Sequence, residues 1–345
     1  MTATANQSPE ASTIQRLGVI GAGQMGGGIA QVAAQRGLHV ELCDISLEVA
    51  QKGKAKLAAG LAKLVEKGKL TAEARDEALS RITVHGDYAA LAGCDFAIEA
   101  ATENQELKKK IFAEMDRHLA PGAILATNTS SISITLLAAV TRRPEQVIGM
   151  HFMNPVPVMS LVEIIRGLQT SDATHDAVKA LAEALGKSPI TVKNAPGFVV
   201  NRILVPMINE AFFVLAEGLA TPEDIDAGMK LGCNHPMGPL TLSDFVGLDT
   251  TYYIANIMFE EFKDRRFAPP PLLKRMVQAG LFGRKSGRGF YDYSDPKNLF
   301  YSEMCQQNSQ ISSFDNLSSH FLPILCLLPL YRPFLFATFV LLILM

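Results

Sequence analysis

Apolar residues along the chain follow two patterns, short continuous runs and longer stretches with helical spacing. The short runs predict buried strands at 17–20, 39–43, 81–85, 94–99, 124–127, 147–150 and 160–165. The helical spacing predicts helices at 24–36, 48–69, 71–80 and 103–119. Ser46 precedes the second of these helices and is a residue type that favours the N-cap position. Strands that alternate with helices at this spacing predict a parallel, doubly wound α/β sheet.

The pattern changes at the segment KNAPG, residues 193–197. No further strand is indicated, and helices are predicted at 198–219, from Pro222 onward, and at 241–245, 249–263 and 271–280. We therefore expect an N-terminal sheet domain at 15–195 and a C-terminal all-helical domain at 196–295. Residues 1–14 are polar, with neither a secretory nor a transit pattern, and predict a disordered leader on a cytoplasmic chain.

A tail at 296–345 departs from the rest in composition. It is first polar and then almost entirely apolar, and the apolar part is long enough to cross a bilayer. Arg332 and three prolines within that part disfavour a continuous helix. A tail anchor therefore stays open. Our interpretation is a segment with no structural role, produced by an altered reading frame or splice event.

The segment LGVIGAGQMGGGIA at 17–30 joins a predicted strand to a predicted helix through a glycine-rich turn. In such a turn Gly21 permits the tight bend, Gly23 lets the backbone approach a pyrophosphate, and Gly26 lets the helix pack closely on the strand. Asp44 ends the next strand, where a carboxylate can accept both hydroxyls of an adenosine ribose. Small residues often serve packing alone, but the strand before, the helix after and the acid beyond favour a dinucleotide site.

Composition narrows the class of protein further. The formal net charge of −2 provides no basic field for a nucleic acid. The five cysteines are scattered without paired spacing or nearby histidines, which argues against a disulfide framework and against a zinc site. We expect a reduced intracellular protein that binds no metal.

Polar side chains gather where predicted strands end. Residues 127–131 (TNTSS) follow one strand, residues 151–155 (HFMNP) follow the next, and Glu163 is expected at the end of a third. Ligands of doubly wound sheets bind beyond the carboxyl ends of strands. Beside a nicotinamide, His151 is suited to accept a hydroxyl proton, with Glu163 holding its other ring nitrogen. The alternative is that His151 is a hydrogen-bonded histidine of the core without a catalytic role and that Glu163 is a surface acid at a strand end.

Eight motifs in order carry a resemblance over about residues 15–293: GAGQMGGGIA, ATEN, NTSS, HFMNPVPVM, LVEII, PGFVVNR, MGPLTLSDFVGLDT and FGRKSGRGFYDY. The chain resembles the L-3-hydroxyacyl-CoA dehydrogenase family, and within it the bacterial 3-hydroxybutyryl-CoA dehydrogenases. The resemblance implies a Rossmann-type domain followed by a helical substrate and dimerisation domain, in a homodimer.

The resemblance also implies the activity: NAD-dependent oxidation of short-chain (S)-3-hydroxyacyl-CoA, and its reversal with acetoacetyl-CoA. It implies that His151 is the base paired with Glu163, and that Ser130 and Asn201 contact the substrate. The implied cofactor contacts are Gly21, Gly23, Gln24, Met25, Gly26, Asp44, Glu103, Lys108, Asn154 and Lys285. Lys67 and Gly60 fall in the region that meets coenzyme A in this family.

Alternatives stay open for several of these residues. Ser130 can instead cap a helix beginning near residue 132, and Asn201 can be a polar anchor within its helix. Lys108 can belong to a solvated charge run with Lys109 and Lys110, and Lys285 stands beside two arginines. Two alternative functions also stay open. The protein can be a dehydrogenase of a free hydroxy acid, or an inactive relative that binds NAD.

Overall fold

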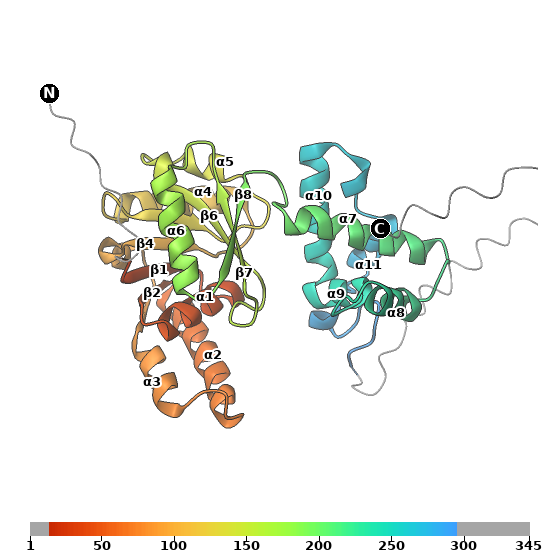
Figure 1. Ribbon diagram of the computed structural model, residues 1–345, viewed down its shortest axis with the longest axis horizontal. Coiled ribbons are helices and arrows are strands. Elements are labelled where there is room, and N and C mark those ends of the chain that lie inside the picture. The colour runs from red at the N-terminus through yellow and green to blue at the C-terminus, as the bar shows by residue number, and fades with distance from the viewer. Residues whose placement is uncertain (1–13, 295–345) are drawn as a thin grey trace, which may run out of the picture. The chain divides into compact units, whose positions relative to one another are not determined.

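The computed structural model describes residues 14–294 (Figure 1). The predicted tail, and the predicted leader up to residue 13, lie outside these residues. Within the described range, eight strands form one sheet in the order β3-β2-β1-β4-β5-β6-β7-β8. The strands are β1 (Arg16–Ile20), β2 (His39–Cys43), β3 (Ile82–His85), β4 (Phe96–Glu99), β5 (Ile124–Thr127), β6 (Val147–Phe152), β7 (Leu161–Arg166) and β8 (Ser188–Lys193).

The predicted doubly wound sheet is confirmed, with one correction to the direction of its strands. Strands β1 to β6 run parallel, but β7 runs antiparallel to β6 and pairs His151 with Glu163. Only residues 153–160 separate these two strands. A parallel crossover needs a dozen residues or more, so this connection can only reverse the chain. Glu163 consequently lies in the middle of β7, and the expectation that it ends a strand is wrong.

Helices cover both faces of the sheet. One core contains residues of α1 (Gln24–Gln35), α2 (Leu47–Glu66), α3 (Ala72–Ser80) and α6 (Asp172–Ala184) together with Leu17 and Val19 of β1. A second core contains residues of α4 (Gln105–His118) and α5 (Ile134–Ala138) together with Ile20. Alternate residues of β1 therefore point into different cores, as expected of a strand buried on both faces.

The sequence patterns did not indicate α6 and β8. Strand β8 is the last strand of the sheet and carries Pro189, which cannot donate a ladder hydrogen bond. Most of its residues are partly or fully exposed, so it has no continuous apolar run. Helix α6 then provides the crossover between the parallel strands β7 and β8.

The remaining described residues are mainly helical, as predicted. The helices are α7 (Val200–Ala216), α8 (Pro222–Gly232), α9 (Pro239–Val246), α10 (Leu248–Phe262) and α11 (Pro271–Gln278). Thr221 caps α8, whose first residue is Pro222. Buried Phe290 and Tyr291 close this part at its C-terminal end. Within residues 14–294, no helix is long and apolar enough to span a membrane.

Candidate active site

The glycine turn after β1 is shaped by close backbone contacts. A Cβ atom on Gly26 would lie 1.7 Å from the Gly21 carbonyl oxygen, and one on Gly21 would lie 2.7 Å from the Ala100 oxygen. Gly21 also has a φ of 104°, which favours glycine. A Cβ on Gly23, in contrast, would meet nothing within 4 Å. The turn is therefore closed behind Gly21 and Gly26 and open at Gly23, as a cradle for a pyrophosphate requires.

Helix α1 begins at this turn, and no side chain caps it. Its first N–H groups are thus available to an anion. Asp44 follows β2 beside the turn, where its Oδ2 accepts a hydrogen bond from the Ala22 N–H at 2.6 Å and its Oδ1 accepts one from the Ile45 N–H at 2.7 Å. A carboxylate has further lone pairs. Asp44 can therefore still accept ribose hydroxyls, and the residues present fit a dinucleotide.

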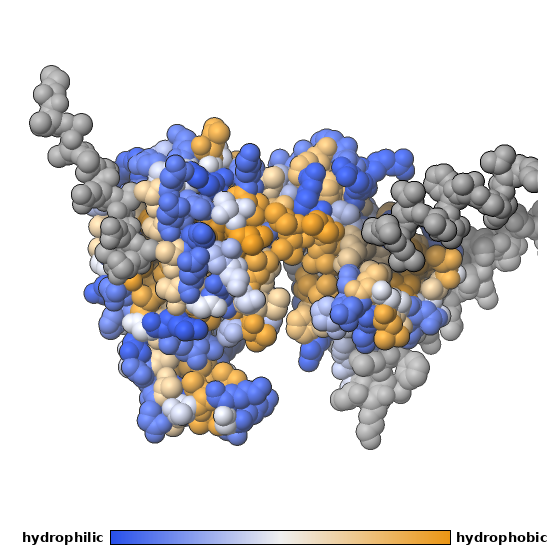
Figure 2. Space-filling view, in the orientation of Figure 1, coloured by the Kyte–Doolittle hydropathy of each residue, from blue (hydrophilic) through white to orange (hydrophobic). Residues whose placement is uncertain are grey.

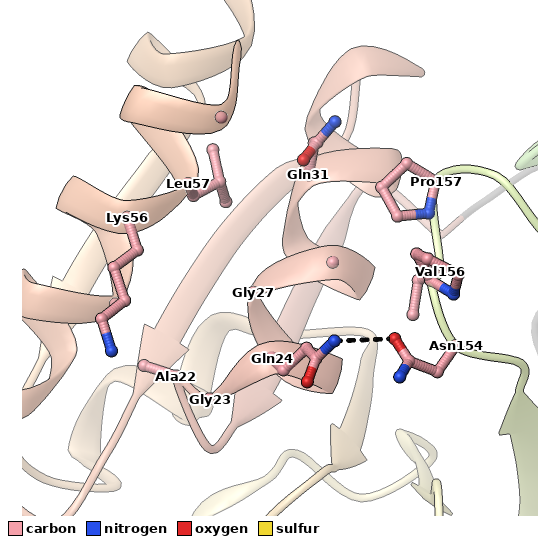
Figure 3. Close-up of a pocket in the computed structure, with 14 residues that line it drawn as sticks. Ala22, Gly23, Gln24, Gly27, Gln31, Lys56, Leu57, Asn154, Val156 and Pro157 are labelled. Carbon is pink, nitrogen blue, oxygen red and sulfur yellow. Dashed lines mark hydrogen bonds between the residues drawn. The ribbon is translucent and has the colours of Figure 1, made fainter. Parts of the chain in front are cut away.

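A cavity of about 360 Å³ lies alongside this turn (Figure 3). Its lining comes from the start of α1, from α2 and from residues 154–157. The Gln24 amide donates a hydrogen bond to Asn154 Oδ1 at 2.9 Å, which joins the two predicted cofactor residues across the cavity. Gly60 lines the cavity, whereas Lys67 is exposed at the end of α2 and Met25 packs against the sheet core.

Three of the predicted catalytic side chains form one chain of contacts. His151 Nδ1 lies 2.8 Å from Glu163 Oε2, and His151 Nε2 lies 3.1 Å from Ser130 Oγ. His151 is 6% exposed and Glu163 is fully buried. An ionised carboxylate can only accept, so the Nδ1 atom carries the hydrogen. The lone pair of Nε2 therefore faces the Ser130 hydroxyl, which is the geometry of a general base.

The other oxygen of Glu163 is also bound. Oε1 accepts hydrogen bonds from the Val199 N–H at 2.9 Å and the Val200 N–H at 3.0 Å. Burial alone would raise the pKa of Glu163, but the hydrogen bonds from His151, Val200 and Val199 hold it below its usual value. The carboxylate is thus kept charged beside the imidazole.

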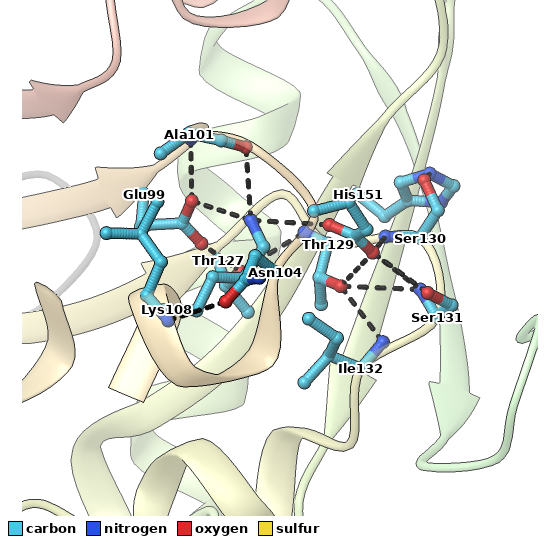
Figure 4. Close-up of polar contacts among 12 residues, drawn as sticks. Glu99, Ala101, Asn104, Lys108, Thr127, Thr129, Ser130, Ser131, Ile132 and His151 are labelled. Carbon is cyan, nitrogen blue, oxygen red and sulfur yellow. Dashed lines mark hydrogen bonds and ion pairs between the residues drawn. The ribbon is translucent and has the colours of Figure 1, made fainter. Parts of the chain in front are cut away.

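Thr129, Ser130 and Ser131 lie together in a network of polar contacts (Figure 4). Glu103 organises this turn. Its Oε1 accepts hydrogen bonds from Thr129 Oγ1 at 2.5 Å, the Ser130 N–H at 2.9 Å, the Ser131 N–H at 3.1 Å and Ser131 Oγ at 3.0 Å. Burial opposes ionisation, but Lys108 and these hydrogen bonds hold the pKa of Glu103 below its usual value. The following helix α5 is capped by Ser133, so the alternative of Ser130 as a helix cap is wrong.

Lys108 is buried, and its assignment to a solvated charge run is wrong. Its side chain is 1% exposed, and its Nζ lies 2.6 Å from Glu99 Oε1 and 3.3 Å from Glu103 Oε2. The Ala101 carbonyl oxygen also accepts from it at 3.3 Å. Three oxygens therefore surround an ammonium group that has three N–H donors. The predicted cofactor contact of Lys108 stays a prediction.

Two other predicted residues lie on the helical part of the chain. Asn201 is half-buried in the first turn of α7. Lys285 pairs with Asp249 at 2.5 Å and is half exposed. Sequence reasoning did not single out Thr129, Ser131 or Phe198, although all three stand in quoted motifs. Among residues 14–294, no group of three or more histidines, cysteines or acids could hold a metal ion.

Two family descriptions match the chain. Residues 16–195 match "3-hydroxyacyl-CoA dehydrogenase, NAD binding domain", and residues 197–293 match "3-hydroxyacyl-CoA dehydrogenase, C-terminal domain".

Similar proteins carry related names. A "Probable 3-hydroxybutyryl-CoA dehydrogenase" of Deinococcus radiodurans is 55% identical over 278 residues, which is 81% of this chain and 100% of that protein. The 3-hydroxybutyryl-CoA dehydrogenase of Bradyrhizobium diazoefficiens is 53% identical over 83% of this chain and 98% of its own. The crystal structure of (S)-3-hydroxybutyryl-CoA dehydrogenase from Ralstonia eutropha has a TM-score of 0.79 and 57% identity, covering 82% of this chain and 100% of that one.

Proposed function

The chain belongs to the 3-hydroxyacyl-CoA dehydrogenase family and is an NAD-dependent oxidoreductase, and from that premise we propose that its substrates are short-chain (S)-3-hydroxyacyl-CoA thioesters. It oxidises them to 3-oxoacyl-CoA and catalyses the reverse reduction of acetoacetyl-CoA. The observation that carries this proposal is the buried contact chain from Glu163 through His151 to Ser130.

In this proposal, His151 Nε2 takes the proton of the 3-hydroxyl group. Glu163, 2.8 Å from Nδ1, stabilises the imidazolium that forms. Ser130 Oγ, 3.1 Å from Nε2, donates a hydrogen bond to the substrate's 3-oxygen and fixes it beside the base. When bound, NAD supplies the acceptor for the hydride that leaves C3. Asn201 contacts the thioester end of the substrate.

The remaining polar residues serve binding. Residues 21–26 and Asp44 hold the dinucleotide, with Gln24 and Asn154 oriented by their mutual hydrogen bond. Asp44 repels a 2′-phosphate, and residues 45–47 (ISL) offer no arginine to receive one, which supports NAD over NADP. Glu103 and Lys108 border the nicotinamide end, Lys285 reaches the cofactor from the helical domain, and Lys67 meets coenzyme A.

A direct assay tests the substrate class. The rate of NADH oxidation is measured with acetoacetyl-CoA and, at equal concentration, with free acetoacetate. We expect turnover with the thioester and little with the free acid. Comparable rates with both would instead favour a hydroxy-acid dehydrogenase. NADH binding without turnover of either compound would favour an inactive relative.

We also infer that residues 15–195 form the NAD-binding domain and that residues 196–295 form a domain for substrate closure and dimerisation. Hydrophobic side chains reach the surface of the helical part (Figure 2). Ile203, Leu219 and Leu231 are 67%, 75% and 85% exposed. A groove of about 440 Å³ lies between α7 and α8, and most of the residues that line it are apolar. Such surfaces support a symmetric partner. Light scattering on the full chain tests this, and an active monomer would contradict it.

A cytoplasmic location is consistent with the cysteines. Cys43 and Cys94 are buried free thiols, and Cys233 is an exposed free thiol. Exposed thiols persist in reducing compartments. Fractionation of cells that express the full chain tests the location.

A further inference from the structure

Phe198 stands between the sheet and α7 in an unusual backbone conformation. Its φ is 51°, in the left-handed region that bulky residues rarely adopt. Lys263 has the same φ, but it is the C-cap of α10, a place where left-handed backbone is common. Phe198 is not at a helix C-cap and stands directly before Val199, the N-cap of α7. Strained backbone of this kind persists only where the surrounding structure enforces it, and it is often found at functional sites.

The surroundings of Phe198 identify what enforces its conformation. The side chain is 4% exposed within the core that packs under β5 and β6. Its ring meets the His151 imidazole edge-on, with centroids 5.6 Å apart and an interplanar angle of 61°. Such aromatic pairs add to the stabilisation from burial. The ring therefore restricts the orientation of the imidazole.

The next two residues begin α7. Val199 is its N-cap and provides no side-chain cap. The N–H groups of Val199 and Val200 instead donate to Glu163 Oε1 at 2.9 Å and 3.0 Å. A carboxylate from β7 thus caps a helix that begins 37 residues later in the chain. The positive end of the α7 dipole faces the same carboxylate that holds His151.

We propose that Phe198, Val199 and Val200 are positioning residues for the His151–Glu163 pair, so that the start of the helical domain sets the orientation and proton affinity of the base. This inference rests on the proposed roles of His151 and Glu163. It assigns a function in the reaction to residues 198–200, which contribute no side-chain acid, base or nucleophile.

The electrostatic consequence has a definite sign. Two N–H donors and a helix N-terminus favour the negative form of Glu163. Removing a donor makes the environment of the pair less positive, so the pair binds its next proton more tightly. Because the two groups titrate together, the measured value belongs to the pair. The acid limb of the activity profile should consequently move to higher pH.

Val200→Pro removes one N–H donor at the first position of α7. Proline also opens α8, α9 and α11, but there it follows a residue with extended ψ, whereas Val199 has φ −101° and ψ −51°, which a following proline disfavours. The substitution therefore also displaces the backbone of Val199. Asp172→Pro is the control for proline at the first position of a helix, because Asp172 is the exposed first residue of α6. We expect Val200→Pro to raise the acid-limb pKa by about one pH unit, the size of one lost bond to a charged group. We also expect kcat to fall about tenfold with KM little changed, since the pair is misplaced while substrate contacts remain. The control should change neither.

Phe198→Gly is the second variant, with Lys263→Gly as its control. Both replace a residue of φ 51° by glycine and both relieve strain, but only the first removes the ring from His151. We expect kcat to fall in Phe198→Gly and to stay at the wild-type level in Lys263→Gly. A purely structural role of Phe198 predicts that the two variants differ only in thermal stability.

Titration by NMR separates this inference from the proposed function. The His151 ring signal is assigned by its absence from His151→Gln and followed with pH in the full-length protein, with no substrate present. A higher apparent pKa in Val200→Pro supports the inference even if acetoacetyl-CoA is not turned over. A folded Val200→Pro with the wild-type titration, together with a Phe198→Gly of wild-type kcat, overturns it.

Discussion

Replacing Glu163 by glutamine changes one atom in the middle of the contact chain. Glu163 faces donors on both sides, the His151 Nδ1–H on Oε2 and two backbone N–H groups on Oε1. A glutamine has one oxygen and one NH2 group, so it can accept on one side only. The backbone donors of Val199 and Val200 cannot change, and we expect the amide oxygen to face them. The NH2 group then faces His151 Nδ1 and forces the ring hydrogen onto Nε2.

The size of the expected fall in kcat follows from the distance between His151 and Glu163. An imidazolium and a carboxylate whose charge centres lie about 4 Å apart attract each other by about 4 kcal/mol at an effective dielectric constant near 20. Losing that stabilisation corresponds to about three powers of ten in rate. The unsuitable tautomer adds to the loss. We therefore expect Glu163→Gln to lower kcat by about 10³–10⁴-fold.

The assay compares kcat for acetoacetyl-CoA reduction with NADH affinity, measured by fluorescence. NADH affinity should stay near the wild-type value, because no nucleotide contact changes. Glu41→Gln is the control, since Glu41 forms a second glutamate–histidine pair with His85 at 2.7 Å. It should leave kcat unchanged. A folded Glu163→Gln that keeps kcat within tenfold of wild type would refute the reasoning.

Three further predictions concern binding and stability. A Cβ on Gly23 enters the open space where the pyrophosphate is expected, so Gly23→Ala should keep the thermal midpoint but weaken NADH binding measured by fluorescence. A Cβ on Gly26 meets the Gly21 carbonyl oxygen, so Gly26→Ala should lower the thermal midpoint. Lys108→Met should lower the free energy of unfolding by about 3–5 kcal/mol in urea titrations, since it leaves Glu99 charged and buried; a loss below 1 kcal/mol would contradict a buried ion pair. Burial raises the pKa of Asp244 from 3.8 to about 6, so the native state binds the extra proton and the contribution of this group to stability should fall by about 3 kcal/mol as pH rises from 4 to 6. Asp244→Asn should remove this contribution, which the difference between wild-type and variant denaturation curves across the same pH range measures.

Local patterns were sufficient for the elements with strong periodicity. The residue type of Ser46 predicts a helix start, and the structure confirms Ser46 as the N-cap of α2. The glycine turn and Asp44 also came from local spacing, because strand, turn and helix are neighbours in sequence. Strand β8 was not predicted, since an exposed edge strand has no apolar run for a pattern to detect.

The sequence alone determined which residue types the site can use: a histidine, two carboxylates, a serine and a glycine turn. Only the tertiary structure decided how they meet. The antiparallel turn between β6 and β7 places Glu163 opposite His151, and a parallel arrangement would not have paired them. The burial of Lys108 and the left-handed Phe198 were equally invisible in the sequence. The physical reason is that direction of pairing, burial of a charge and strain in one residue depend on contacts between segments far apart in the chain, whereas caps, turns and periodicity depend only on neighbours.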